Sequence, residues 1–154
     1  MKIPFTKMHG LGNDFMVVDA TKRDLGLRPE LIKKLSDRNF GVGFDQLLLV
    51  ENASAKEMDF HYRIFNTDGT EVEHCGNGAR CFATFVRDKG LSDKSSIKVS
   101  TINRNLELTI HDDGKISVDM GCPEFNPSVI PFLCDSRLNT YERFIEISGS
   151  KKAI

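Results

Sequence analysis

The segment Cys75-Gly76-Asn77-Gly78 has the residue types of a reactive thiol site. It begins a run of apolar residues that predicts a helix from about Asn77 to Lys89, closed by Gly90. Helix N-termini carry backbone N–H groups without intrahelical partners and a positive dipole end, so they bind anions and favour a thiolate over a thiol. The segment therefore predicts a reactive cysteine beside a bound carboxylate. Taken alone, the same residues also fit a small apolar cysteine that caps a core helix.

The elements that must position this helix are mostly strands. Alternating apolar residues and turn signals predict them at Ile3–Met8, Phe15–Asp19, Leu47–Val50, Met58–Ile64, Ile97–Thr101, Leu106–Ile110, Ile116–Met120 and Phe144–Ile147. A short helix is expected at Pro29–Leu35, with the proline at its first position. This order predicts an α+β fold, in which a mostly antiparallel sheet surrounds a central apolar helix.

The chain is expected to divide near residue 120. Residues 1–120 contain enough apolar positions for one sheet and one helix, and they include Cys75. Residues 121–154 begin with prolines spaced four apart (Pro123, Pro127 and Pro131), which suits an extended connector. Because this second part has too few apolar positions for its own core, we expect it to be a connector and the truncated start of a second domain.

Composition excludes several classes of partner. The 154 residues carry 21 basic and 22 acidic side chains, a net charge of −1, so neither nucleic acid nor a membrane is expected as a partner. The N-terminus has no apolar segment of the signal-peptide type, which predicts a cytoplasmic protein with reduced thiols. The spacing of the four cysteines fits no zinc template, and the adjacent side chains of His74 and Cys75 diverge, so no metal is expected.

Four segments, in this order and at these spacings, closely resemble the N-terminal half of diaminopimelate epimerase. They are Lys7-Met8-His9-Gly10-Leu11-Gly12-Asn13-Asp14-Phe15, Gly41-Val42-Gly43-Phe44-Asp45-Gln46, Tyr62-Arg63-Ile64-Phe65-Asn66-Thr67-Asp68-Gly69 and Glu73-His74-Cys75-Gly76-Asn77-Gly78-Ala79-Arg80-Cys81. The resemblance implies two pseudo-symmetric domains, each a curved sheet around a central helix, with the substrate in the cleft between them. It also implies a cytoplasmic enzyme of lysine synthesis that interconverts LL- and meso-diaminopimelate without a cofactor, and a homodimer when the protein is full length.

The resemblance assigns roles to individual residues. Cys75 would be one of two catalytic thiols, one of which removes the α-proton as a thiolate while the other returns a proton on the opposite face. Three side chains match the family's substrate contacts, namely those of Asn13, Gln46 and Asn66. Gly76 and Asn77 match backbone contacts to the reacting α-carboxylate. Arg80 is expected to hold the sheet or a dimer rather than to contact substrate.

Inversion at the α-carbon needs acid–base groups on opposite faces, and this chain holds one suitable thiol. Cys81 lies six residues further along the same helix, ~9 Å along its axis and about 240° around it, so it cannot face Cys75 across a substrate. Cys122 and Cys134 follow no glycine-rich helix start, and all three are interpreted as structural thiols. The family's second cysteine lies in a later Cys-Gly-x-Gly motif. We therefore expect this chain to be inactive by itself.

Two other functions stay open at this point. The first is an amino-acid racemase or isomerase on the same fold, of the proline racemase or phenazine-biosynthesis type. The second is a binding module that keeps half of a pocket without the chemistry. Testing diaminopimelate against proline for α-proton exchange would separate the epimerase from the racemase.

Overall fold

The computed structural model describes residues 2–130, 132–134, 138, 144–147 and 150–153. The chain forms two compact units, Met1–Met120 and Gly121–Ile154, which are described separately below. The interpretation of the second unit as the start of another epimerase domain stays a prediction. No helix among the described residues combines the length and the apolar character needed to cross a membrane.

The first unit is built on one curved, mostly antiparallel sheet. Its strands are β1 (Thr6–Gly10), β2 (Asn13–Asp19), β3 (Gln46–Asn52), β4 (Phe60–Asn66), β5 (Glu71–Val72), β6 (Ser96–Ser100), β7 (Asn105–Ile110) and β8 (Ile116–Val118). Their order across the sheet is β1-β2-β3-β4-β6-β7-β8, and β5 pairs with β4 outside this path. Only the β2–β3 and β4–β6 pairs of this sheet are parallel. The predicted fold class is confirmed.

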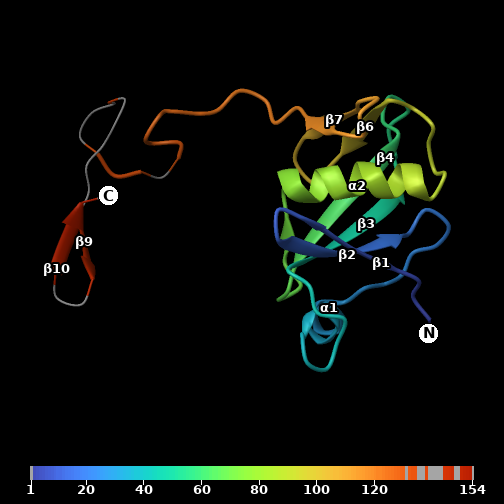
Figure 1. Ribbon diagram of the computed structural model, residues 1–154, viewed down its shortest axis with the longest axis horizontal. Helices are drawn as coiled ribbons and strands as arrows, with labels where there is room; N and C mark the ends of the chain where they lie inside the picture. Colours follow the sequence, from blue (N-terminus) through green and yellow to red (C-terminus); the bar gives the residue numbers. More distant parts are fainter. Residues whose placement is uncertain (1, 131, 135–137, 139–143, 148–149, 154) are drawn as a thin grey trace. The chain divides into compact units, whose positions relative to one another are not determined.

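The helix α2 (Gly76–Asp88) packs on one face of this sheet (Figure 1). Its buried face holds the predicted apolar stripe, including Ala79, Phe82, Ala83 and Val86. Alternate residues of the central strands point toward it, namely Phe15 and Val17 of β2, Leu48 and Val50 of β3, and Tyr62 and Ile64 of β4. Since side chains alternate between the faces of a strand, the register of these strands determines which polar residues share this face.

The opposite face of the sheet is covered by the short helix α1 (Pro29–Ser36). Here the intervening residues of the central strands, such as Met16 and Leu47, pack with Ile32 of α1 and with Phe44. Burial on both faces explains why β2 and β3 read as continuous apolar runs rather than as alternating ones. The sequence placed both helices, but it did not indicate that they lie on opposite faces.

The second unit contains a two-stranded antiparallel hairpin, β9 (Phe144–Ile147) and β10 (Ser150–Ala153). The prediction included β9, whereas β10 and the two-residue β5 were missed because such short polar segments carry little periodicity. Residues 121–126 contain neither helix nor strand, and a turn follows at 127–130, as expected for a connector rich in proline. The third proline of the predicted spacing, Pro131, lies outside the described residues.

Candidate functional site

Cys75 is the N-cap residue of α2. Its backbone is extended (φ −145°, ψ 116°), and its sulfur accepts a hydrogen bond from the backbone N–H of Gly78 at 3.4 Å. Gly76 and Asn77 are the first two residues of the helix, so their N–H groups have no intrahelical partners. The half-buried thiol therefore stands next to a set of backbone donors that can hold an anion.

A tight hairpin brings Asn13 to this thiol. Strands β1 and β2 are joined by Leu11 (φ 55°) and Gly12 (φ 87°), and Gly10 pairs with Asn13. Two successive residues with positive φ give the turn whose twist matches the strands on either side. The hairpin end also packs on the helix start, since a Cβ on Gly10 would lie 3.5 Å from Cβ and O of Asn77. The Cys75 thiol donates to Oδ1 of Asn13 over 3.6 Å.

Gln46 and Asn66 are brought together by strand register. Phe15 of β2 pairs with Gln46, the first residue of β3, and Gln46 pairs with Asn66, the last residue of β4. The side-chain amide of Gln46 donates from Nε2 to Oδ1 of Asn66 at 3.1 Å. Oε1 of Gln46 is buried and has no hydrogen-bond partner among the described residues.

The three polar side chains lie on the sheet face that carries α2. Asn13 is two residues before Phe15, Gln46 two before Leu48, and Asn66 two after Ile64, and those three apolar residues all pack in the α2 core. These positions are also at the end of the strands where α2 begins. The fold thus gathers the predicted site residues Asn13, Gln46, Asn66, Cys75, Gly76 and Asn77. Their roles toward a substrate stay predictions.

Charged residues beneath Asn13 form a network that the sequence reasoning did not find. Arg38 pairs with Asp14 at 2.7 Å and with Asp45 at 2.8 Å, and Lys7 also pairs with Asp14. The hydrogen bond from Arg38 holds the pKa of Asp14 well below its usual range, against the opposing effect of burial and with further help from Lys7. Lys7, Asp14 and Asp45 lie in segments that carry the family resemblance, so a signal for them was present.

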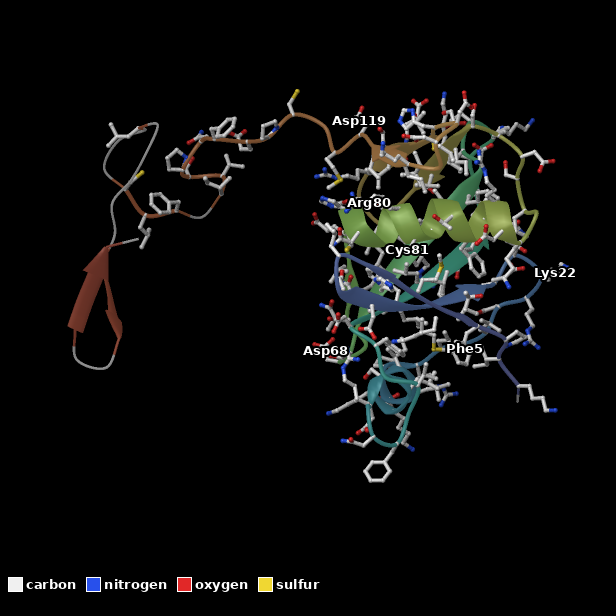
Figure 2. All side chains as sticks on the ribbon, viewed as in Figure 1. Phe5, Lys22, Asp68, Arg80, Cys81 and Asp119 are labelled. Atoms are coloured by element: carbon white, nitrogen blue, oxygen red, sulfur yellow. The ribbon has the colours of Figure 1, made fainter. Side chains whose placement is uncertain are left out.

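Further residues near Cys75 also lacked a predicted role at the site. Arg80 donates to Oδ1 of Asn77 and leaves α2 on a different side from Cys81 (Figure 2). Arg80 therefore lies beside the helix start, a position that its spacing of three residues from Asn77 could have indicated. The Tyr62 hydroxyl and Nδ1 of His74 are buried without hydrogen-bond partners among the described residues. Burial raises the pKa of Tyr62 well above its usual value, so this phenol is neutral.

The other cysteines differ from one another. Cys81 is 5% exposed within the α2 core, and burial raises the pKa of its thiol, which supports its interpretation as a structural residue. Cys122 is exposed, and its interpretation as a structural thiol stays a prediction. Cys75, Cys81 and Cys122 are all free thiols. Among the residues that the structure describes, no three histidine, cysteine or acidic side chains are grouped as metal ligands would be.

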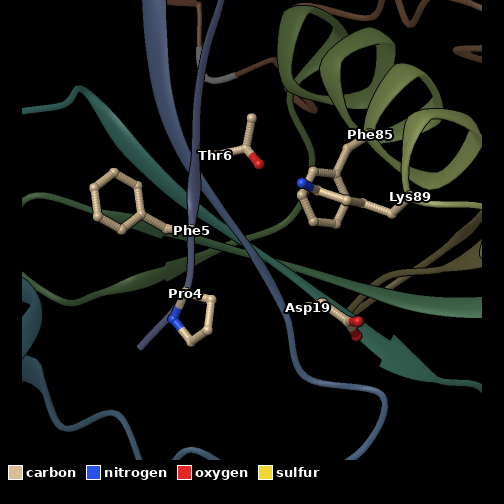
Figure 3. A pocket seen from close by; sticks show the side chains of 6 residues that line it. All are labelled: Pro4, Phe5, Thr6, Asp19, Phe85 and Lys89. Carbon is tan, nitrogen blue, oxygen red and sulfur yellow. The ribbon is translucent and has the colours of Figure 1, made fainter. Parts of the chain in front are cut away.

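Figure 3 shows the side chains that line a pocket of about 210 Å³. This pocket lies at the opposite end of β2 and α2 from Asn13 and Cys75. Pro4, Phe5, Thr6, Asp19, Phe85 and Lys89 line it. Asp19 is the last residue of β2, and Lys89 caps the C-terminus of α2, whereas Asn13 and Cys75 lie at the beginnings of these elements. The pocket lies at the C-terminal end of α2, whose dipole disfavours a bound carboxylate, and no thiol lines it, so we place the candidate site at the N-terminus of α2.

The arrangement at this end suits proton transfer next to a carboxylate. A thiol can act as acid or base, helix N–H groups can stabilise negative charge that develops on a bound carboxylate, and neighbouring amides can bind the remaining polar groups of a ligand. Glycine at position 78 is required for this packing. A Cβ there would meet the Tyr62 hydroxyl at a separation below 3.0 Å, which real Cβ atoms essentially never show.

Solved structures with a similar fold include an isomerase and an epimerase. A phenazine biosynthesis protein of the PhzF family from Bacillus anthracis is 25% identical, with a TM-score of 0.56 over 77% of this chain and 40% of that protein. A methylitaconate-delta-isomerase is 18% identical, with a TM-score of 0.59 over 80% of this chain and 66% of that protein. A hydroxyproline epimerase from Agrobacterium vitis, solved with trans-4-hydroxy-L-proline bound, is 11% identical, with a TM-score of 0.56 over 74% of this chain and 40% of that protein.

This chain spans less than two thirds of the length of each of these proteins. Its fold is one that isomerases and epimerases share. The sequence model of the diaminopimelate epimerase family matches residues 5–126, which include every residue of the candidate site. The chain belongs to the diaminopimelate epimerase family.

Proposed function

We propose that this chain carries one half of a diaminopimelate epimerase active site, with Cys75 as one of two acid–base thiols. The observation that carries the proposal is the position of this thiol, which caps a glycine-rich helix start beside Asn13, on the sheet face where Gln46 and Asn66 meet. The family match over residues 5–126 supports diaminopimelate as the substrate. Assembly into a homodimer in the full-length protein also stays a proposal.

In the proposed reaction, the substrate's α-carboxylate binds the N–H groups of Gly76 and Asn77. The Cys75 thiolate takes the α-proton and becomes a thiol, while the electron pair left on carbon delocalises into the carboxylate. The dipole and the N–H donors of α2 stabilise that charge. In the reverse direction the thiol gives a proton back on the same face. Asn13, Gln46 and Asn66 bind other polar groups of the substrate.

Inversion requires a second acid–base group on the other face of the α-carbon. Of the four cysteines, only Cys75 is followed by glycine, and Cys81 is buried in the α2 core. We therefore expect this 154-residue chain, by itself, to exchange the α-proton of one stereoisomer without converting it into the other.

The test is an incubation of the purified chain with LL- and with meso-diaminopimelate in D2O, followed by mass spectrometry and chiral chromatography. We expect slow deuterium incorporation with retention of configuration, lost in Cys75→Ser and kept in the matched control Cys122→Ser. Fast conversion of the LL isomer to the meso isomer that depends on Cys75 would contradict the one-face mechanism. The proposed function would be refuted if neither isomer exchanges its α-proton and if diaminopimelate also fails to protect Cys75 from an alkylating reagent.

Two additional measurements distinguish the alternatives: the same exchange assay with proline or hydroxyproline, and alkylation of Cys75 with and without diaminopimelate. Exchange into proline or hydroxyproline instead of diaminopimelate would favour a racemase of the proline type. If diaminopimelate protects Cys75 from an alkylating reagent but no exchange occurs, a binding module would be favoured.

A further inference from the structure

Asp45 lies directly behind Asn13, at the junction between the loop that follows α1 and strand β3. Its Oδ2 atom accepts hydrogen bonds from Nδ2 of Asn13 at 3.0 Å and from the backbone N–H of Asp14 at 3.1 Å. Its Oδ1 atom accepts from Arg38 at 2.8 Å. The backbone N–H of Asp45 in turn donates to two oxygens of Asp14, its backbone carbonyl at 2.9 Å and its side-chain Oδ1 at 3.0 Å. The carboxylate is therefore held from several directions.

This carboxylate determines which way the Asn13 amide faces. An ionised carboxylate only accepts hydrogen bonds, so the Asn13 atom that contacts it must be the NH2 group. The carbonyl oxygen of Asn13 then faces Cys75, at 3.6 Å from the sulfur. A carbonyl oxygen also only accepts, so it can bond the S–H of a thiol but not a thiolate.

The Cys75 sulfur thus has one neighbour that stabilises its thiolate form and one that stabilises its thiol form. The N–H of Gly78 donates to the sulfur and stabilises its anionic form, whereas the Asn13 carbonyl accepts from the protonated form. We propose that Asp45 is a positioning residue that orients the Asn13 amide and thereby holds Cys75 as a thiol, the form that donates a proton. The significance for catalysis rests on the proposed function, but the orientation itself does not.

Other ionisable groups near Cys75 are the same in every variant of the test. Tyr62 of β4 and Cys81 of α2 interact electrostatically with Cys75, and burial raises the pKa of both, so both are neutral at pH 7. His74 precedes Cys75 in the chain, and Arg80 bonds Asn77. A change in the titration of Cys75 between variants therefore reports on Asp45 and Asn13.

The experiment measures the alkylation rate of Cys75 by iodoacetamide between pH 5 and 10 in the 154-residue chain. Peptide mass spectrometry isolates this thiol, since trypsin cleaves after Arg80 and so separates Cys75 from Cys81. In Asp45→Ala the Asn13 amide can turn its NH2 group toward the sulfur. We expect the alkylation rate of Cys75 at pH 7 to rise by up to about tenfold.

Asp45→Asn separates orientation from simple loss of charge. The two N–H donors that meet at Oδ2 require an oxygen there, so the new amide presents its carbonyl to Asn13 and keeps the original orientation. We expect the alkylation rate of Cys75 at pH 7 in Asp45→Asn to stay within about twofold of the parent rate. If charge alone mattered, Asp45→Asn would behave like Asp45→Ala, and that result would overturn the proposal.

A double-mutant cycle and a remote control complete the test. Asn13→Ala should itself raise the alkylation rate of Cys75 at pH 7, and in that background Asp45→Ala should have no further effect, because Asp45 acts through Asn13. An Asn13→Ala chain with an unchanged Cys75 titration would also overturn the proposal, even if Asp45→Ala fails to fold. Asp59→Ala removes a similar carboxylate, paired with Lys94 and the backbone of Lys98, and should leave Cys75 unchanged. None of these outcomes depends on exchange into diaminopimelate, so this inference and the proposed function can fail separately.

Discussion

Gly78→Ala is expected to destabilise the first unit, although alanine is the better helix former. A Cβ at this position would overlap the Tyr62 hydroxyl and would touch Leu48 Cδ2 and Phe15 Cε1 at 3.4 Å. All three neighbours are at most 1% exposed, and the Tyr62 ring is also packed on Phe82 with ring centroids 4.7 Å apart. The backbone of α2 or the tyrosine must therefore move.

The size of the effect follows from two opposing contributions. Overpacking a core of this kind costs about 1–3 kcal/mol. Replacing glycine by alanine in the first turn of a helix returns about 0.5 kcal/mol. The net loss is about 0.5–2.5 kcal/mol. A unit of 120 residues has an unfolding entropy of about 0.25 kcal/mol/K, so the melting temperature should fall by about 2–10 °C.

Calorimetry and urea denaturation of four chains test this reasoning: the parent, Gly78→Ala, Tyr62→Phe and the double variant. The Tyr62 hydroxyl has no hydrogen-bond partner among the described residues, so Tyr62→Phe should be neutral or stabilising by up to about 1 kcal/mol. It also removes the atom that a new Cβ would meet first, so the double variant should regain about 1 kcal/mol or more. Gly76→Ala is the matched control, since its nearest neighbour would be Met120 Sδ at 3.7 Å, an ordinary contact. A Gly78→Ala chain as stable as the parent, or a loss unchanged by Tyr62→Phe, would refute the argument.

Further predictions concern a turn and an ion pair. Gly69 has φ +85° and a Cβ there would overlap the backbone of Pro29, whereas Gly114 has a similar φ of +80° with nothing within 4 Å. We expect Gly69→Ala to lose about 1–3 kcal/mol more than Gly114→Ala in urea denaturation, and equal losses would show that the Pro29 contact is unimportant. The folded-state pKa of Asp14 is lowered, chiefly by Arg38, so its contribution to stability is fully present above about pH 5 and is lost as the pH falls below about 4. The stability difference between the parent and Asp14→Asn should therefore narrow on acidification from pH 7 to 3, and a constant difference would contradict this assignment.

Local patterns in the sequence were sufficient to predict the central helix and most strands. The stripe of Ala79, Phe82, Ala83 and Val86 has the helical period, so it predicted both α2 and its buried face. Cys75 at the start of that helix was also predictable, because capping depends on residues adjacent in sequence. The predicted strand boundaries were less accurate where pairing with a neighbouring strand sets them. The first strand was predicted at Ile3–Met8 and lies at Thr6–Gly10, since its limits are set by the hairpin with β2.

The sequence by itself determined that a thiol caps a glycine-rich helix, since this depends on neighbouring residues alone. Only the tertiary structure decided what surrounds that thiol. Register between β2, β3 and β4 brought Gln46 and Asn66 to the face that carries α2, and the tight hairpin carried Asn13 to the sulfur. The direction of the Asn13 amide depends on Asp45, thirty-two positions away in the chain. Residues that are adjacent in sequence do not predict such contacts, because the contacts arise from strand pairing and because each buried hydrogen-bond donor needs an acceptor.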